Sequence, residues 1–268
     1  MNNLMILSVL CMAGLAIFFA GILAFADKKL KVAEDPKIEE INSLLPGVNC
    51  GACGFLSCHD FAEHIVTEGA DPGKCRVVQE ETRKKLFELT GEEKTERYPR
   101  IALIHCAART ENKKMTADYN GVKTCSGANL VFGGGLACKY GCMALGDCER
   151  VCHFGAIRME EGLAVVDPDK CTGCGKCVSA CPRGIIILEE KRFEKLFYVA
   201  CTSRDAMMRT REVCSVGCIA CGICVKLDAA GYFEVKDNLS KADYAKQDNP
   251  EKIEKIKDKC PTKVIKEI

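Results

Sequence analysis

The spacing of the cysteines constrains this chain more than any other feature, and there are 21 of them in 268 residues. Their tightest run is Cys171-x2-Cys174-x2-Cys177-x3-Cys181-Pro182. Three cysteines spaced in this way wrap one iron–sulfur cubane, and the fourth points away to ligate a neighbouring cluster. Zinc usually takes its four thiolates from two separated pairs. Disulfide scaffolds are usually short secreted domains, and this chain is long. The run therefore predicts [4Fe–4S] chemistry.

A second run supplies the partner half that such a motif needs. It reads Cys138-x3-Cys142-x5-Cys148-x3-Cys152, and its ending Cys152-His153-Phe154-Gly155-Ala156-Ile157 aligns with Cys181-Pro182-Arg183-Gly184-Ile185-Ile186, with His153 in place of proline. Its first spacings are wider than those of the usual two-cluster pattern. We expect one cluster to be held by Cys138, Cys142, Cys148 and Cys181. The other cluster is then held by Cys152, Cys171, Cys174 and Cys177.

Two further four-cysteine sets lie on either side of this region. The N-terminal set is Cys50-x2-Cys53-x4-Cys58-x16-Cys75, with Gly51 and Gly54 inside its loop. It suits a cubane, although spacing alone leaves zinc open. The C-terminal set is Cys218-x2-Cys221-x2-Cys224-x35-Cys260-Pro261. A close trio with one remote Cys-Pro is typical of a single-cluster ferredoxin. Cys214 precedes this trio and could replace one of the four cysteines of the set.

Apart from Cys11 in the apolar N-terminal segment, four cysteines belong to none of these sets: Cys106, Cys125, Cys201 and Cys214. Two of them end strand-like segments, Ile101–Cys106 and Leu196–Cys201, which suggests a weak internal repeat. A fifth cluster is one interpretation. Surplus buried thiols are the favoured one, because free cysteine is a common core residue. The motifs thus predict at least three clusters, four with the C-terminal set, and five if the remainder binds one.

An almost unbroken apolar run from Leu4 to Ala26 precedes the cysteine motifs. A helix of this length crosses a bilayer core of roughly 30 Å. Ala24-Phe25-Ala26 resembles a signal cleavage site, but the run is long and no basic residue precedes it. Lys28, Lys29 and Lys31 follow it instead. The positive-inside rule then predicts a retained single-pass anchor in the inner (cytoplasmic) membrane, with the rest of the chain in the cytoplasm. Cys11 lies within the run and is expected to be a membrane-buried thiol.

The predicted fold is α+β and has five parts. These are a transmembrane anchor (1–26), a linker (27–36), a small helical 4Fe–4S domain (37–100), a ferredoxin-like two-cluster domain (101–190) and a ferredoxin-like C-terminal iron–sulfur extension (191–268). Within the last part, Lys241–Lys259 is polar and is expected to form a solvated helix or insertion.

Other function classes find little support in the sequence. The formal net charge is +1, whereas a nucleic-acid-binding chain would carry a basic excess or stripe. No G-x-G-x-x-G segment opens a helix, so no dinucleotide site is indicated. We expect no catalytic residue and no cofactor beyond the clusters. The chain is expected to move single electrons.

The anchor, the Cys50–Cys75 set and the two-cluster region together resemble the B subunit of the Rnf complex, a membrane-bound ion-translocating ferredoxin:NAD oxidoreductase. The resemblance covers residues 1 to about 188, and the part beyond is similar to the extended B subunits of anaerobic bacteria. It implies that reduced ferredoxin delivers electrons to this chain. Other subunits would hold flavins, bind NAD and move Na⁺ or H⁺. The alternative is a membrane-tethered subunit of a corrinoid- or molybdenum-dependent enzyme, and a zinc-stabilised interaction module is a third hypothesis.

Overall fold

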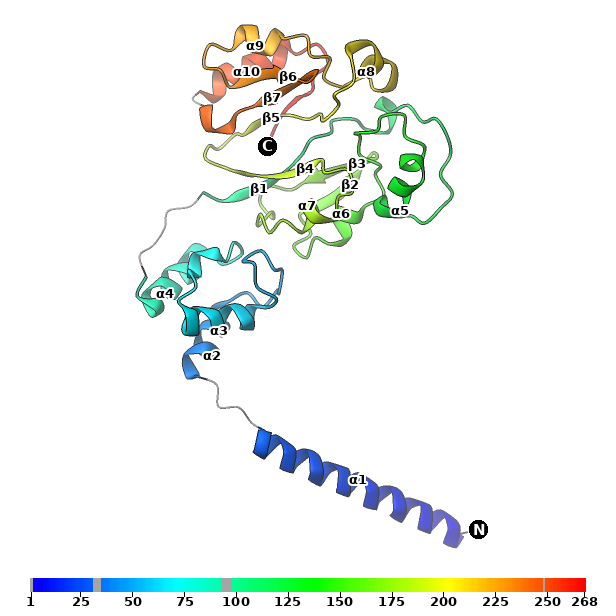
Figure 1. Cartoon of the computed structure of the whole chain (residues 1–268), viewed down its shortest axis with the longest axis vertical. Coiled ribbons are helices and arrows are strands. Elements are labelled where there is room, and N and C mark those ends of the chain that lie inside the picture. The colour runs from blue at the N-terminus through cyan, green and yellow to red at the C-terminus, as the bar shows by residue number, and fades with distance from the viewer. Residues whose placement is uncertain (1, 31–34, 93–97, 248) are drawn as a thin grey trace.

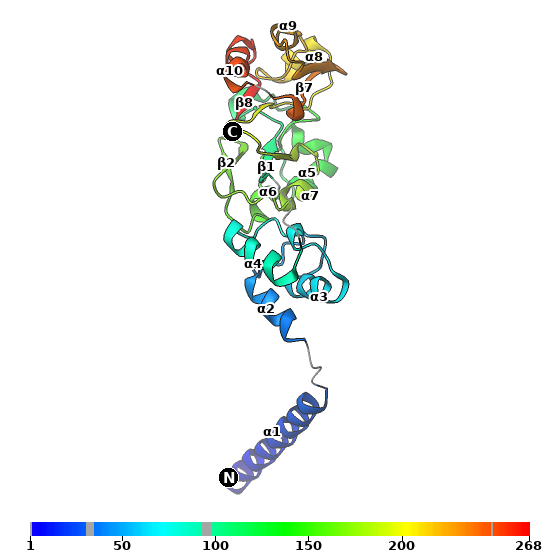
Figure 2. The same cartoon turned by 90° about the vertical axis from the view of Figure 1, so that its left-hand side faces the viewer.

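The computed structural model describes residues 2–30, 35–92, 98–247 and 249–268. A long N-terminal helix, a small helical unit and a larger body of short helices and two-stranded sheets follow one another along the molecule (Figure 1). Turning the molecule by 90° keeps the same order (Figure 2). This mixed architecture with one N-terminal apolar helix confirms the predicted α+β class.

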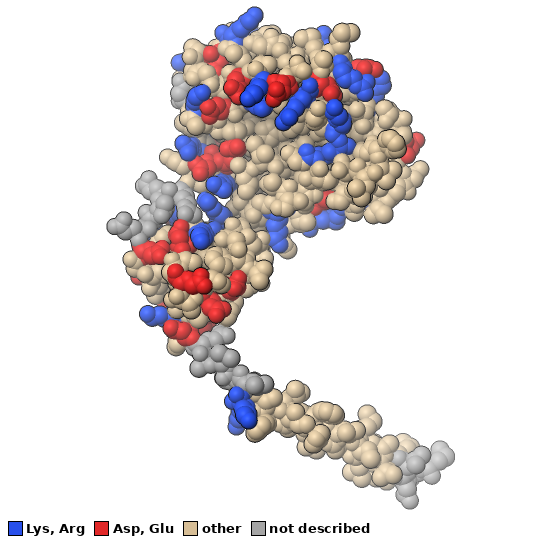
Figure 3. Space-filling view, in the orientation of Figure 1, with Lys and Arg blue, Asp and Glu red and all other residues tan. Residues whose placement is uncertain are grey.

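Helix α1 (Asn2–Leu30) contains an apolar stretch, Met5–Ala26, that could cross a membrane by its length and composition. None of this stretch is buried against the rest of the chain. The helix continues past the predicted end of the anchor, and its last turn carries Lys28 and Lys29. In Figure 3 the helix is uncharged along its length and basic at the end that faces the small unit. Residues 31–34 of the predicted linker, Lys31 included, lie outside the described residues.

The small unit consists of α2 (Pro36–Leu44), α3 (Cys58–Glu68), the 3-10 turn η1 (Pro72–Lys74) and α4 (Glu80–Thr90). Ser57 caps α3, because its hydroxyl accepts the backbone N–H of Asp60 at 3.0 Å. Gly69 ends the same helix in the left-handed conformation. The helices enclose one apolar core made of Ile38, Ile41, Leu45, Phe61, Ala62, Ile65 and Leu86.

The first repeat, residues 100–190, is framed by an antiparallel pair of strands far apart in sequence. Strand β1 (Arg100–Ile104) pairs with β4 (Ile186–Glu190), so that Ile104 lies opposite Ile186. Between them stands the hairpin β2 (Ile157–Glu160)–β3 (Leu163–Val166). The connecting elements are η2 (Thr110–Asn112), α5 (Cys125–Leu130), η3 (Phe132–Gly135), α6 (Asp147–Arg150) and α7 (Lys176–Ala180).

The second repeat, residues 196–268, uses the same plan. Strand β5 (Phe197–Val199) pairs antiparallel with β8 (Ile265–Glu267), and a hairpin, β6 (Phe233–Lys236)–β7 (Leu239–Ala242), stands between them. The other elements are α8 (Met207–Val213), α9 (Ile223–Leu227), η4 (Tyr244–Lys246) and α10 (Pro250–Lys259). Both predicted strands, in 101–106 and 196–201, are confirmed as β1 and β5.

The helix expected within Lys241–Lys259 is confirmed as α10 (Pro250–Lys259), but one of its faces is buried and not solvated. The segment spans the end of β7, then η4 and α10. Ile253 and Ile256 lie three residues apart on α10, and both are buried in the core of the second repeat. They share one helical face, so a few apolar positions bury a helix that is otherwise charged.

The two repeats contact each other where their first strands end. The His105 ring, through Nδ1, makes a hydrogen bond with the Val199 carbonyl oxygen at 2.9 Å. The Lys114 N–H donates to the Val213 carbonyl oxygen at 3.2 Å. Contacts of this kind fix the two halves against each other, and several cysteines lie at this junction.

Candidate metal centres

Four cavities in the larger body are each lined by four cysteines. Cavity A is lined by Cys152, Cys171, Cys174 and Cys177. Gly173 has φ +65, and a Cβ at this position would lie 2.5 Å from the Arg100 carbonyl oxygen. Only glycine therefore allows the loop to pass this close to β1. The structure brings together the same four cysteines that the spacing groups as one set.

Cavity B is lined by Cys125, Cys142, Cys148 and Cys181, whereas the spacing groups Cys138 with the last three. Comparison with the second repeat explains why Cys125 takes the place of Cys138. Its Cys218-x5-Cys224 segment matches Cys142-x5-Cys148, but Leu145 stands where the second repeat has Cys221. The missing thiol is replaced by one from the insertion that contains α5.

Helix α5 is held in place by one carboxylate. The backbone N–H groups of Cys125 and Ser126 each donate to Asp147 at 2.9 Å. Asp147 directly precedes Cys148, so this contact places the Cys125 thiol beside the other three. The signal that could have revealed Cys125 is the gap at Leu145, which leaves a three-cysteine set one ligand short.

Cavity C is lined by Cys218, Cys221, Cys224 and Cys260, the C-terminal set that the spacing predicts. The Ser240 N–H donates to the Cys218 sulfur at 3.4 Å. The Ser240 hydroxyl lies 3.2 Å from the Cys224 sulfur. Strand β7 thus supplies polar contacts to two of the four thiols.

Cavity D is lined by Cys106, Cys138, Cys201 and Cys214. It receives three of the four cysteines that the motifs leave over, together with Cys138. The Cys142 N–H donates to the Cys106 sulfur at 3.5 Å, so cavities B and D are direct neighbours.

The small unit holds Cys50, Cys53, Cys58 and Cys75 in and around one loop. Gly51 and Gly54 turn this loop with φ of +71 and +91. Cys53, Cys58 and Cys75 pack against the core of the unit. Burial raises the pKa of the Cys50 thiol, and interaction with Cys174, which lines cavity A, raises it further. The loop of the small unit therefore lies within electrostatic range of cavity A.

Burial gives several of these thiols strongly raised pKa values. Burial first, and neighbouring cysteines second, raise the pKa of Cys148 and of Cys177 to about 12. Without a metal such side chains are neutral at pH 7, whereas a metal binds the thiolate. A buried set of four thiols is therefore suited to a group whose iron ions offset the charge of the sulfurs.

The geometry also bears on the kind of metal group. Within the described residues, no three cysteine, histidine or acidic side chains are grouped so as to hold a single metal ion. A cubane distributes its four thiolates over four separate irons. Four-cysteine cavities of this kind are suited to that larger group.

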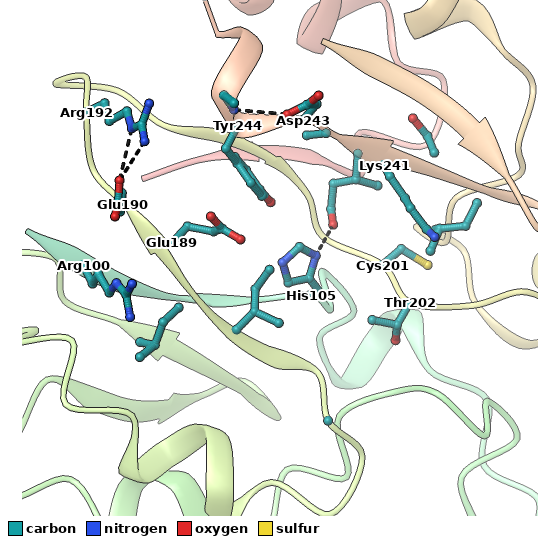
Figure 4. A pocket seen from close by; sticks show the side chains of 18 of the residues that line it. Arg100, His105, Glu189, Glu190, Arg192, Cys201, Thr202, Lys241, Asp243 and Tyr244 are labelled. Carbon is teal, nitrogen blue, oxygen red and sulfur yellow. Dashed lines mark hydrogen bonds and ion pairs between the residues drawn. The ribbon is translucent and has the colours of Figure 1, made fainter. Parts of the chain in front are cut away.

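A fifth and larger cavity, about 770 Å³, is of a different kind. Figure 4 shows it lined by charged side chains, and Arg192 pairs with Glu190 at 2.9 Å. His105, Cys201 and Thr202 lie together at one end. The mixed charges of this lining do not resemble the cysteine cavities.

Comparison with protein families identifies two iron–sulfur regions. The FeS family model, which describes an Fe–S cluster domain, matches residues 45–77. The Fer4 model, a 4Fe-4S binding domain, matches residues 164–187. The first match contains the cysteine loop of the small unit, and the second contains the run from Cys171 to Cys181.

Curated relatives match nearly the whole chain. The B subunit of the ion-translocating oxidoreductase complex of Methanosarcina acetivorans is 37% identical over 92% of this chain and 93% of its own length. The B subunit of the Na(+)-translocating ferredoxin:NAD(+) oxidoreductase complex of Acetobacterium woodii is 36% identical over 99% of this chain and 78% of its own. The proton-translocating counterpart of Clostridium ljungdahlii is 33% identical over 99% and 93%. The chain therefore belongs to the B-subunit family of the Rnf-type ion-translocating oxidoreductase complexes.

Proposed function

We propose that this chain carries electrons from reduced ferredoxin toward the membrane subunits of an ion-translocating ferredoxin:NAD oxidoreductase. The observation that carries the proposal is the series of cysteine sites. The loop of the small unit adjoins cavity A through Cys50 and Cys174. Cavity A adjoins cavity B, because α7, which bears Cys177, packs against α6, which bears Cys148. Electron transfer slows steeply with distance, so closely spaced sites are what such a role requires.

The ligand sets follow from the cavities. We propose that Cys152, Cys171, Cys174 and Cys177 hold one cluster, and Cys218, Cys221, Cys224 and Cys260 another. A third set is Cys50, Cys53, Cys58 and Cys75. In cavity B, Cys125 joins Cys142, Cys148 and Cys181. A [4Fe–4S] cluster, when bound, takes up and releases one electron at a time.

The residues of the chain position the ligand sulfurs. Backbone N–H groups point at ligand sulfurs, as that of Ala156 does toward Cys152 at 3.3 Å. Hydrogen bonds of this kind tune a cluster's reduction potential. The five-part division made from the sequence is proposed as the domain organisation, with the small unit and the two repeats as separate cluster-binding bodies.

We further propose that α1 anchors the chain with the iron–sulfur part in the cytoplasm. Lys28 and Lys29 at the end of the helix support this orientation. The segment Met5–Ala26 has no acidic or basic residue, so it offers no ion path of its own. The translocated ion, Na⁺ or H⁺, would therefore pass through the other subunits. Protease added to sealed inverted vesicles should digest the iron–sulfur part, and digestion only in right-side-out vesicles would contradict the orientation.

The assembled complex, reconstituted in vesicles, tests the electron path. With reduced ferredoxin as donor, Cys174→Ser should abolish NAD reduction, because it removes a ligand of cavity A. Cys11→Ser, in the membrane helix, is the matched control and should leave the rate unchanged. If the Cys174→Ser complex reduces NAD at the full rate, the proposed path is wrong.

A further inference from the structure

Cavity D is a space between the two repeats that no cysteine motif predicts as a unit. The space inside it that the centre of a water-sized molecule can occupy is about 30 Å³. The corresponding space is about 20 Å³ in each of cavities A, B and C. Cavity D is therefore large enough for whatever the other three hold.

Two of its cysteines occupy equivalent turns after the first strand of each repeat. The Cys106 N–H donates to the Ile104 carbonyl oxygen at 2.8 Å, and the Cys201 N–H donates to the Val199 carbonyl oxygen at 2.9 Å. The residue before each cysteine is tied in the same way to the segment that ends its repeat. The backbone N–H of His105 donates to the Ile185 carbonyl oxygen at 2.7 Å, and the backbone N–H of Ala200 donates to the Val264 carbonyl oxygen at 2.8 Å. The two thiols are thus presented by the same local structure.

The other two cysteines are also equivalent. Cys138 and Cys214 each open a Cys-x2-Gly-Cys segment. The second cysteine of each segment belongs to its own repeat's cavity, Cys142 to cavity B and Cys218 to cavity C. Each repeat therefore sends one strand-end thiol and one segment-start thiol into the shared space. The result is a four-thiol set to which each repeat contributes an equivalent pair.

The surroundings resemble those of the other cysteine cavities. The Ser203 N–H donates to the Cys201 sulfur at 3.4 Å, as the Cys142 N–H does to Cys106. Lys113 lines the cavity, and its ammonium group donates to the Cys142 and Gly162 carbonyl oxygens at 2.7 and 2.5 Å. An oxidised cubane with four thiolates carries about two negative charges. A fixed lysine beside it offsets part of this charge.

We propose that Cys106, Cys138, Cys201 and Cys214 bind a fifth [4Fe–4S] cluster at the junction of the two repeats. The site links cavity B to cavity C. The Cys142 N–H donates to the Cys106 sulfur, and Gly217, which lines cavity D, directly precedes Cys218 of cavity C. The sequence-based preference for surplus buried thiols is replaced by this proposal, because the thiols surround one cavity instead of being scattered through the core.

Iron and acid-labile sulfide, counted per chain in the full-length protein purified without oxygen, give the first test. Five cubanes predict roughly twenty of each, and four predict roughly sixteen. A count of about sixteen in the wild-type protein overturns the proposal without recourse to any variant. This measurement does not depend on ferredoxin, so it stands apart from the proposed electron path.

Variants test which cysteines share the site. Cys201→Ala and Cys214→Ala should each lose about four irons, while Cys11→Ala loses none. Adding Cys138→Ala to Cys214→Ala should cause no further loss, because both ligate one cluster. Adding Cys138→Ala to Cys125→Ala should double the loss to about eight. If instead Cys138→Ala deepens the loss of Cys214→Ala and not that of Cys125→Ala, then Cys138 belongs to cavity B and the proposal fails.

Discussion

The first and second repeats have the same strand pairing, but they fill the space inside it differently. Between its hairpin and its Cys-Pro step, the first repeat places the cavity A loop and the short helix α7. At the same place the second repeat has α10, whose Ile253 and Ile256 are buried with Tyr232 and Phe233. Both repeats have an apolar core, but the first encloses two cysteine cavities, and the second encloses one cavity and the packed helix α10.

This difference shows what a cluster does for a fold. The core of the first repeat combines aliphatic side chains with four buried cysteines, Cys106, Cys142, Cys148 and Cys177, whereas the core of the second repeat includes one, Cys218. Iron bound to such thiols would contribute directly to folding, as structural metals do. In the second repeat, each large buried apolar side chain contributes about 1.5–3 kcal/mol by leaving water. We infer that the first repeat depends on iron and that the second is partly independent of it.

Removal of the clusters should reveal the largest difference in stability between the two repeats. After oxidation and chelation of the iron, we expect hydrogen-exchange protection of β1 and β4 to fall by about 100-fold or more, since about 3 kcal/mol or more of metal-linked folding energy is lost. Protection of β6, β7 and α10 should fall much less. Exchange measured by mass spectrometry on the intact chain, before and after treatment, compares the two. Equal losses in both repeats would show that the apolar core of the second does not stand alone.

A single residue, Leu145, distinguishes the cluster motif of the first repeat from that of the second. Cys125→Ala should lose about four irons, and adding Leu145→Cys should restore them, because a thiol then stands where the second repeat has Cys221. Leu145→Cys alone should leave the iron content unchanged. The mirror change, Cys221→Leu, should empty cavity C. The comparison fails if Leu145→Cys does not rescue the Cys125→Ala chain.

Local patterns predicted much of this fold. The apolar run predicted α1, and the two apolar segments before Cys106 and Cys201 predicted β1 and β5. Cavities A and C contain the cysteines that their spacing groups together, because the ligands of each lie mainly in one tight loop. In these cases a few neighbouring residues determine the geometry.

Prediction was weaker wherever distant segments meet. Cys125 reaches cavity B through Asp147, a contact across the α5 insertion that no spacing rule describes. Cys138 and Cys214 look like members of their nearest motifs, yet both line cavity D, which exists only once the repeats pack. The polar segment 241–259 was expected to be solvated, but Ile253 and Ile256 bury one face of α10. Tertiary packing decided each of these cases.

The smallest expected effect concerns Asp147, which holds α5 in the first repeat. The second repeat has Ile223 at the equivalent position. Burial tends to raise the pKa of the Asp147 carboxyl, but the Cys125 and Ser126 N–H groups, with Arg150, outweigh it and hold the pKa below its usual range. A lowered pKa stabilises the fold above the unfolded value of about 3.9, and the effect is lost as the pH falls through the folded value. Asp147→Asn should therefore cost about 1 kcal/mol at about pH 7, seen as about fivefold faster exchange of the α5 amides. The difference should hold from about pH 7 to about pH 5, and Asp169→Asn, at an exposed site, should show none. Unchanged exchange in α5 would mean that the insertion is held by other contacts.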